Sequence, residues 1–139
     1  MTNIDGIKLL CSFIPYFENL DPDKAYRFKG GDKRKNGTIT IGYYEYDKEF
    51  IKFIDAFYES KLSVEDYQNE LNARVPDWQT ADMFKVIETD DLELIRIILT
   101  KGIRVERFHE GAWANYIKIG LFLAILRRLE ALQADMEGL

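Results

Sequence analysis

YIKIGLFLAILRRLEAL, residues 116–132, contains the longest apolar run of the chain and predicts a mainly helical fold. Its apolar side chains recur at helical spacing and are Tyr116, Ile117, Leu121, Leu123, Ile125, Leu126, Leu129 and Leu132. Because the middle of this helix is apolar nearly all round, it is either the central helix of the core or partly the surface of a homodimer. The second alternative predicts a dimer that buries Phe122, Leu123 or Leu126.

Earlier stretches show the same three- and four-residue spacing and predict further helices. We expect them at residues 4–17, 47–58, 63–72, 77–87 and 90–102. Pro15 should kink or end the first helix, and Asp47 and Asp77 should cap the second and the fourth. Ser63 and Asp66 read as a capping box for the third, and the fifth is opened by Asp90 with Glu93 and ended by Gly102. On the stripes of the last two long helices, 90–102 and 116–132, and in the loop between them, we expect six residues to be largely buried: Ile95, Leu99, Phe108, Ile117, Leu121 and Ile125.

One β-hairpin is predicted near the N-terminus. Residues 25–29 and 38–44 read as short strands, and Gly30-Gly31 and Asn36-Gly37 favour positive φ in the loop between them. The fold class is therefore α+β and predominantly helical, with one N-terminal hairpin packed on a bundle of about five helices. Because no linker divides the chain, we expect residues 1–139 to form a single domain, with 133–139 as a frayed tail.

The composition argues against several kinds of site and location. Cys11 is the sole cysteine and lies among apolar residues, so we interpret it as a small buried hydrophobe rather than a disulfide or a metal ligand. The chain lacks His-Glu-x-x-His, calcium-loop and phosphate-loop spacings. Ile119–Leu126 is far shorter than the roughly 20 residues of a membrane-spanning helix, and the N-terminus has no secretory pattern. We therefore expect no cofactor, no metal, no membrane span and a cytoplasmic location.

Charge is unevenly distributed along the chain. Residues 24–35 carry six basic side chains against Asp32, whereas residues 59–93 carry ten acidic side chains against three basic ones. If these segments fold onto different faces, the molecule can steer an anionic partner to one side; the alternative is ordinary solvated surface. The pI near 5.0 argues against nucleic acid as the partner, and Tyr26 and Phe28 suit a core as well as a stacking platform.

The densest mixture of charge, aromatic rings and glycine is RVERFHEGAW, residues 104–113. The residues that carry a resemblance are Thr100, Arg104-x-Glu106-Arg107-Phe108-x-x-Gly111, Gly120 and Leu126-Arg127-Arg128-Leu129. They resemble a small bacterial family of unknown function whose members typically read Arg-Gly-Glu-Arg-Phe-x-Asp-Gly here, and Tyr43 and Tyr46 resemble its tyrosine-rich entry to the first long helix. The resemblance spans about residues 43–132 and implies a shared fold and a shared site, with no activity, cofactor or catalytic residue to transfer.

The segment departs from that family pattern at two positions. Val105 stands where glycine is usual, so a glycine-dependent backbone turn is unnecessary there. Glu110 stands where aspartate is usual, which keeps the carboxylate but places it one methylene further out.

The arginines of this segment suit an anion site. Arg104 and Arg107 carry planar forks that bind carboxylate or phosphate through two hydrogen bonds, and Glu106 could orient one of them. We expect one surface-accessible site in which Glu106 or Glu110 holds Arg107, because a partly buried guanidinium needs a fixed partner. Arg104 then stays free to meet an anion.

Two further residues complete this expected site. Gly111 would let the backbone approach a ligand, and Trp113 would stack on the ligand or wall the pocket. A structural interpretation also stays open. In it, Glu106 and Arg107 form a partly buried ion pair that ties the loop to the helices, Phe108 and Trp113 enter the core, and Gly111 takes a positive φ.

Two functions remain open. We prefer a non-enzymatic binding module in which residues 104–113 recognise an anionic small molecule or a protein partner. The alternative is an enzyme acting on a nucleotide-like or other anionic substrate, with Glu106 or His109 as acid or base. His109 is the sole histidine, but no serine or cysteine nucleophile is evident beside it. An enzyme should hold an unpaired carboxylate with a raised pKa in a cleft, whereas a binding module should leave both carboxylates paired.

Overall fold

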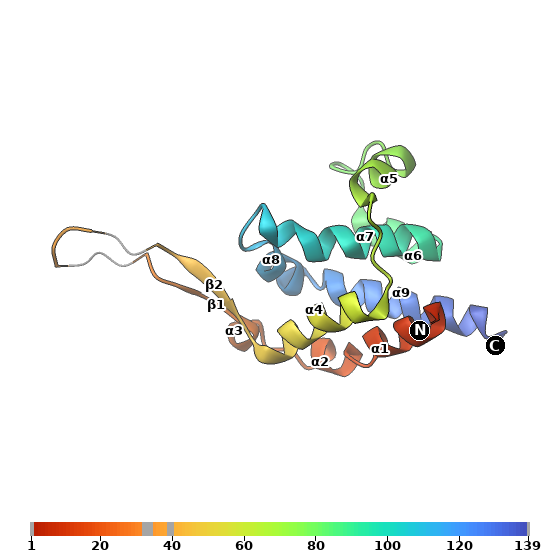
Figure 1. Cartoon of the computed structure of the whole chain (residues 1–139), viewed down its shortest axis with the longest axis horizontal. Coiled ribbons are helices and arrows are strands. Elements are labelled where there is room, and N and C mark those ends of the chain that lie inside the picture. The colour runs from red at the N-terminus through yellow and green to blue at the C-terminus, as the bar shows by residue number, and fades with distance from the viewer. Residues whose placement is uncertain (1, 32–34, 39–40, 139) are drawn as a thin grey trace.

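Helices make up most of the computed structural model, which describes residues 2–31, 35–38 and 41–138 (Figure 1). The elements formed by these residues are α1 Asn3–Cys11, α2 Ile14–Glu18, α3 Pro22–Ala25, β1 Tyr26–Lys29, β2 Tyr43–Tyr46, α4 Lys48–Ser60, α5 Tyr67–Arg74, α6 Met83–Thr89, α7 Leu92–Arg104, the 3-10 turn η1 Val105–Arg107, α8 Ala112–Ile119 and α9 Leu121–Met136. This order confirms the predicted α+β class and its predominantly helical character. The helices are shorter and more numerous than expected.

α9 is the central helix of the fold. In Figure 1 it runs between a layer that contains α1 and α4 and a layer that contains α6 and α7. Phe122, Ile125 and Leu126 have no exposed surface and belong to the same buried cluster as residues of those layers. The prediction that Phe122 or Leu126 forms a homodimer surface is therefore wrong. The helix is apolar nearly all round because other helices of the same chain surround it, and Leu123 is also partly buried against them.

The predicted core is otherwise largely confirmed. The members that are at most 6% exposed are Ile95, Leu99, Ile117, Leu121 and Ile125. Phe108 is the exception, since 71% of its surface is exposed. The helical periodicity thus identified the buried faces of α7, α8 and α9. It did not predict the exposure of Phe108, which lies in the turn between α7 and α8.

The ends of α7 and α9 differ from the predicted ones. Gly120 takes φ 78° and separates α8 from α9, which the periodicity alone joins into one helix. Gly102 lies inside α7 instead of ending it. α7 is capped by Asp91 and not by Asp90, because the Asp91 side chain is the one that accepts a hydrogen bond from the Leu94 N–H.

Other helix ends also need correction. α6 is capped by Asp82, whereas the carbonyl of Asp77 closes a turn before that helix. The Asp66 side chain makes no capping hydrogen bond to α5 within the described part of the chain, so the expected capping box is wrong. Pro15 lies in the first turn of α2, where its missing N–H is tolerated, and α9 continues to Met136 through the residues expected to fray.

One local prediction agrees with the structure, and a second agrees in part. The Asp47 side chain caps α4 by accepting a hydrogen bond from the Glu49 N–H at 2.7 Å. Cys11 is partly buried against α9, where its Sγ lies 3.6 Å from the Leu126 carbonyl oxygen. Burial raises the pKa of the Cys11 thiol to about 11.

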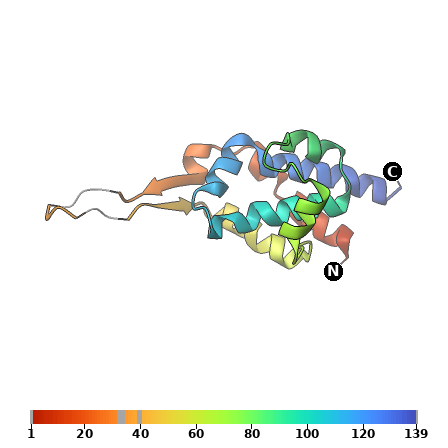
Figure 2. The same ribbon diagram turned by 90° about the horizontal axis from the view of Figure 1, so that it is seen from above.

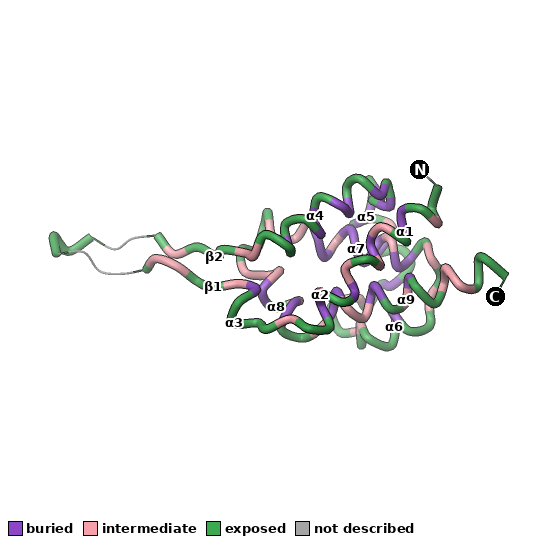
Figure 3. Tube along the Cα trace, turned by 90° about the horizontal axis from the view of Figure 1, so that it is seen from below, coloured by how far each residue is buried: buried purple, intermediate pink, exposed green. Residues whose placement is uncertain are grey.

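The hairpin projects from the end of the bundle opposite both termini (Figures 1 and 2). Its strands pair antiparallel, with Tyr26 opposite Tyr46 and Lys29 opposite Tyr43. The first strand agrees with the prediction, but the second lies at Tyr43–Tyr46 rather than at 38–44, of which residues 39 and 40 are outside the described residues. The strands contain no fully buried residue, as Figure 3 shows, but Tyr26 and Tyr46 pack partly buried against the core, so the base of the hairpin packs on the bundle as predicted. We call residues 26–46 the arm.

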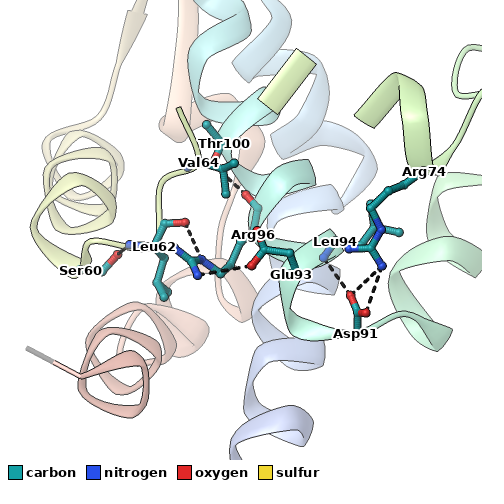
Figure 4. Close-up of polar contacts among 9 residues, drawn as sticks. All are labelled: Ser60, Leu62, Val64, Arg74, Asp91, Glu93, Leu94, Arg96 and Thr100. Carbon is teal, nitrogen blue, oxygen red and sulfur yellow. Dashed lines mark hydrogen bonds and ion pairs between the residues drawn. The ribbon is translucent and has the colours of Figure 1, made fainter. Parts of the chain in front are cut away.

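α7 holds the chain that connects α4 to α5 through polar contacts (Figure 4). The Thr100 side chain is fully buried; its Oγ1 accepts a hydrogen bond from the Val64 N–H at 3.1 Å and donates one to the Arg96 carbonyl at 2.7 Å. The Arg96 Nε donates to the Leu62 carbonyl at 3.0 Å. Thr100 therefore satisfies the Val64 N–H, a backbone group that would otherwise be buried without a partner.

Candidate functional site

The segment 104–113 forms the corner between α7 and α8. α7 ends at Arg104, the 3-10 turn follows, and Gly111 takes φ 93° immediately before α8. Residues with a side chain rarely adopt that conformation. The positive φ expected for Gly111 is confirmed, and the corner requires it.

Glu106 caps α8 from outside the helix. Its carboxylate accepts hydrogen bonds from the N–H groups of Gly111 at 3.1 Å and Trp113 at 2.9 Å. It also accepts from the Tyr46 hydroxyl at 2.7 Å, and the Tyr46 oxygen in turn accepts from the Ala114 N–H at 3.3 Å. Burial, together with the hydrogen bond to Glu106, raises the pKa of the Tyr46 phenol. The two side chains thus satisfy N–H groups that the start of a helix leaves unpaired.

Glu110 and Gly111 hold the neighbouring part of β2. The Glu110 carboxylate accepts a hydrogen bond from the Tyr44 N–H at 2.9 Å. Gly111 lies so close to the Tyr44 ring that a Cβ on it would lie 2.7 Å from Tyr44 Cε2. A residue larger than glycine would therefore push the strand away from the corner.

Aromatic rings continue this attachment into the core. The Trp113 ring lies 5.3 Å from the Tyr46 ring and 5.4 Å from the Phe50 ring, and its Nε1 donates to the Ile103 carbonyl at 2.9 Å. Trp113 takes the place beside Phe50, which leaves Phe108 outside the core. We call Glu106, Glu110, Gly111 and Trp113 the arm socket, because each of them contacts Tyr44 or Tyr46.

The two arginines are placed differently from the prediction. Arg104 is half-buried, and its guanidinium lies over the Tyr67 ring, 5.7 Å from the ring centre. Arg107 is exposed and lines a hollow of about 250 Å³ with Tyr58 and Trp113. Among the ion pairs of the described residues, none involves either arginine. The expected carboxylate partner of Arg107 is wrong, because both glutamates of the segment bond to N–H groups and a tyrosine instead.

Phe108 and His109 lie at a second hollow. Its volume is about 120 Å³, and its other lining residues are Tyr67, Gln68, Lys101 and Val105. The hollow beside Arg107 is lined by Glu106 and Trp113 from the same segment. The structure therefore divides the single expected site into a socket that holds the arm and two separate hollows.

The whole sequence identifies the family. The model of a family of unknown function, DUF6508, matches residues 3–135. The chain belongs to this family. The match begins well before the region 43–132 suggested by the resemblance, so it includes the arm as well as the socket. No curated protein and no solved structure matches the chain.

The sequence reasoning missed the partner of the socket in this DUF6508 chain, namely Tyr44. One signal could have revealed it. In the run YYEY, residues 43–46, Tyr44 and Tyr46 stand two residues apart and so share one face of a strand. That spacing indicates a common contact surface, whereas Tyr43 and Tyr46, the pair noted in the resemblance, point to opposite faces.

Two other kinds of feature are absent from the described part of this DUF6508 chain. There, no group of three or more His, Cys, Asp and Glu side chains is placed to hold a metal ion. Within the same residues, no helix combines the length and the apolar character needed to cross a bilayer.

Proposed function

We propose that this chain is a non-enzymatic binding module that recognises an anionic group of a small molecule or a protein partner at the hollow beside Arg107. The observation that carries the proposal is the division of charge within residues 104–113. Glu106 and Glu110 accept hydrogen bonds from donors of their own chain, whereas Arg107 is exposed beside a hollow. The segment therefore offers a cationic group to a ligand while its carboxylates are engaged.

The hollow suits a small anion. A guanidinium binds carboxylate or phosphate through two parallel hydrogen bonds, and aromatic walls stack on the flat part of a ligand. Tyr58 and Trp113 line the hollow beside Arg107. Arg104 is stacked on an aromatic ring, so the roles expected from the sequence are exchanged: Arg107 meets the anion and Arg104 supports the fold.

The positions of Glu106 and His109 favour binding over the enzymatic alternative. A general base needs a free lone pair within hydrogen-bond reach of the substrate. Both carboxylate oxygens of Glu106 already accept hydrogen bonds from Gly111, Trp113 or Tyr46. His109 is exposed at the other hollow, so the two residues do not face one substrate.

Titrations with pyrophosphate and, separately, with citrate test the proposal by amide chemical shifts. We expect shifts at Arg107 and Trp113, and at least a tenfold loss of affinity, about 1.4 kcal/mol, in Arg107→Ala. Arg127→Ala is the matched control, because Arg127 is also an exposed arginine but pairs with Glu18 and does not line this hollow. Its affinity should equal that of the wild type.

Three results would reject the proposal. The first is the absence of shifts with either anion, and the second is equal affinity of Arg107→Ala and the wild type. The third is release of orthophosphate from pyrophosphate at a rate that Glu106→Gln abolishes, which would favour the enzymatic alternative.

A further inference from the structure

A hollow lies between α6 and α9, away from the residues of the proposed function. The two helices pack against each other, as Figures 1 and 3 show, and the hollow between them has a volume of about 340 Å³. Its lining residues stand three or four positions apart on each helix, so they belong to one face of α6 and one face of α9. The hollow beside Arg107 is lined by other residues. Small-molecule sites begin at about 300 Å³, so this hollow is large enough for one.

Short apolar side chains leave this space open. Four of the lining residues are apolar, namely Phe84 and Ile87 from α6 and Ala124 and Ala131 from α9. Ile87 is 1% exposed and Phe84 is 38% exposed. The methyl groups of the two alanines do not fill the space that larger side chains fill elsewhere between packed helices. An apolar chain that enters the hollow is therefore shielded from water by both helices.

Arg128 lines the same hollow and lacks a counter-ion. It is partly buried, and its Nε and Nη2 donate to the Asp90 carbonyl at 3.1 and 2.8 Å. Among the ion pairs in the part of the chain that the structure describes, none involves Arg128. A carbonyl orients a guanidinium but carries no net charge to balance it, and the remaining N–H groups are left for another acceptor. An anion in the hollow would therefore meet a cation that is already held in position.

The two other charged residues at the hollow leave this cation available. Arg127 pairs with Glu18 at 3.3 Å, so its charge is balanced within the chain. Glu88 is exposed, and it belongs to none of the ion pairs of the described residues. Water and salt screen an exposed carboxylate, so Glu88 opposes an anion less than the partly buried Arg128 attracts it.

We propose that the hollow between α6 and α9 binds a free monocarboxylic acid with a short aliphatic chain. The carboxylate lies on Arg128, and the chain lies against Phe84, Ile87 and the two alanines. Ala124 and Ala131 are separated by about 10 Å along α9, which matches an extended chain of about eight carbons. This site is independent of the hollow beside Arg107.

A helix of a partner protein is the competing occupant. A stable protein interface buries at least about 1,000 Å² and needs apolar anchors along the whole contact. Among the described residues of α6 and α9, the large apolar side chains that are substantially exposed are Phe84 and Met136, and Met136 does not line the hollow. Glu130 and Asp135, which are exposed on α9 near Ala131, are charged. The apolar surface is thus confined to the hollow, which favours a small ligand.

Titration with octanoate tests the proposal through the amide chemical shifts of the protein and the Nε–H signal of Arg128. We expect shifts at Ile87, Ala124 and Arg128. The dissociation constant should fall about fourfold for each methylene group from butanoate to octanoate, because each buried methylene contributes a similar transfer free energy. Octanol has the same chain but no anion, so it should bind at least tenfold more weakly than octanoate.

Two variants locate the ligand. Ala131→Phe places a ring in the hollow from an exposed helical position and should weaken octanoate binding at least tenfold. Its matched control, Ala73→Phe, makes the same change at an exposed position of α5 that does not line the hollow, and its affinity should equal that of the wild type. Arg128→Met removes the charge and keeps an apolar stem, so it should bind octanoate no more tightly than octanol. Circular dichroism of the variants should match the wild type, and the two alanine variants decide the test if Arg128→Met does not fold.

Several results would overturn the proposal. They are the absence of shifts at the hollow, equal affinity for octanol and octanoate, and equal affinity of Ala131→Phe and Ala73→Phe for octanoate. A peptide that ends in apolar residues offers the same chemistry from a protein, and its tighter binding at these residues would overturn the free acid as the ligand. Arg107→Ala should leave octanoate affinity unchanged, and a loss there would place the acid in the other hollow. Excess citrate lacks an aliphatic chain and should not displace octanoate, so this proposal and the proposed function fail separately.

Discussion

The arm and the segment 61–74 are both attached to the helical bundle, but in different ways. The arm contains no buried residue in its strands and is held by the carboxylates and rings of the socket. The segment 61–74, which includes α5, buries Leu62, Tyr67 and Leu71 against the bundle and adds polar contacts to α7. The arm is therefore attached at its base by hydrogen bonds and aromatic contacts of partly buried residues, whereas the second segment places fully buried residues in the core.

This difference teaches which attachment can be loosened without unfolding the chain. Buried apolar side chains pack together with the rest of the core, so truncating one of them lowers the free energy of unfolding of the whole domain. A hydrogen-bonded socket stabilises mainly the element that it holds, since local openings cost less than global unfolding.

The largest expected effect tests the segment that belongs to the core. Leu71 is 1% exposed, and truncation of a buried leucine to alanine leaves a cavity. Leu71→Ala should lower the free energy of unfolding by about 2–5 kcal/mol in urea titrations. Phe28→Ala is the contrasting variant on the arm and should cost less than about 0.5 kcal/mol, because Phe28 is mostly exposed. Equal losses in the two variants would contradict the distinction between the attachments.

A smaller effect is expected where α7 holds the connection to α5 by a buried hydroxyl. Thr100→Val keeps the shape of the side chain but removes the acceptor of the Val64 N–H. The buried N–H then lacks a partner, so the variant should lose about 1–3 kcal/mol of unfolding free energy. Thr100→Ser keeps the hydroxyl and should lose less. A more stable valine variant would show that the hydroxyl is not needed.

The helical part of the fold was predictable because burial repeats locally along the sequence. The stripes of α7 and α9 identified Ile95 and Ile125 as core residues from spacing alone. Helix ends were less predictable, because neighbouring candidates such as Asp90 and Asp91 satisfy the same capping rule. Only the packed helix decides which of them caps it.

The candidate site was predictable in position but not in geometry. Its segment was recognisable, yet the tyrosines that bond to Glu106 and Glu110 lie 60 and 66 residues away in the chain. No local pattern indicates that a carboxylate will bind a tyrosine hydroxyl and helix N–H groups rather than the adjacent arginine. Contacts of that separation depend on how the helices pack.

The socket should loosen when its central carboxylate is removed. Glu106→Ala leaves the N–H groups of Gly111 and Trp113 and the Tyr46 hydroxyl without their acceptor. We expect a loss of about 1–2 kcal/mol in unfolding free energy. Amide hydrogen exchange should become faster than in the wild type at Gly111 and Trp113, but not in the core of α9. Glu59→Ala, at an exposed position of α4, is the control and should change neither. Uniformly faster exchange across α9 would mean that the socket is part of the core.

The smallest effect concerns the pH dependence of the second attachment. The Asp91 carboxylate accepts hydrogen bonds from the Leu94 N–H and the Arg74 guanidinium, and these lower its pKa from the ordinary 3.8. A lowered folded-state pKa means that the contribution of Asp91 is fully present above the unfolded value and is lost as pH falls through the folded value. Because the side chain is largely exposed, this contribution should be below about 1 kcal/mol. Urea midpoints measured from about pH 6 down to pH 3 should show wild type and Asp91→Asn converging below about pH 4, while Asp55→Asn, at an exposed position of α4, follows the wild type throughout. A constant difference between wild type and Asp91→Asn would show that the shape of the cap, and not its charge, stabilises the link between α5 and α7.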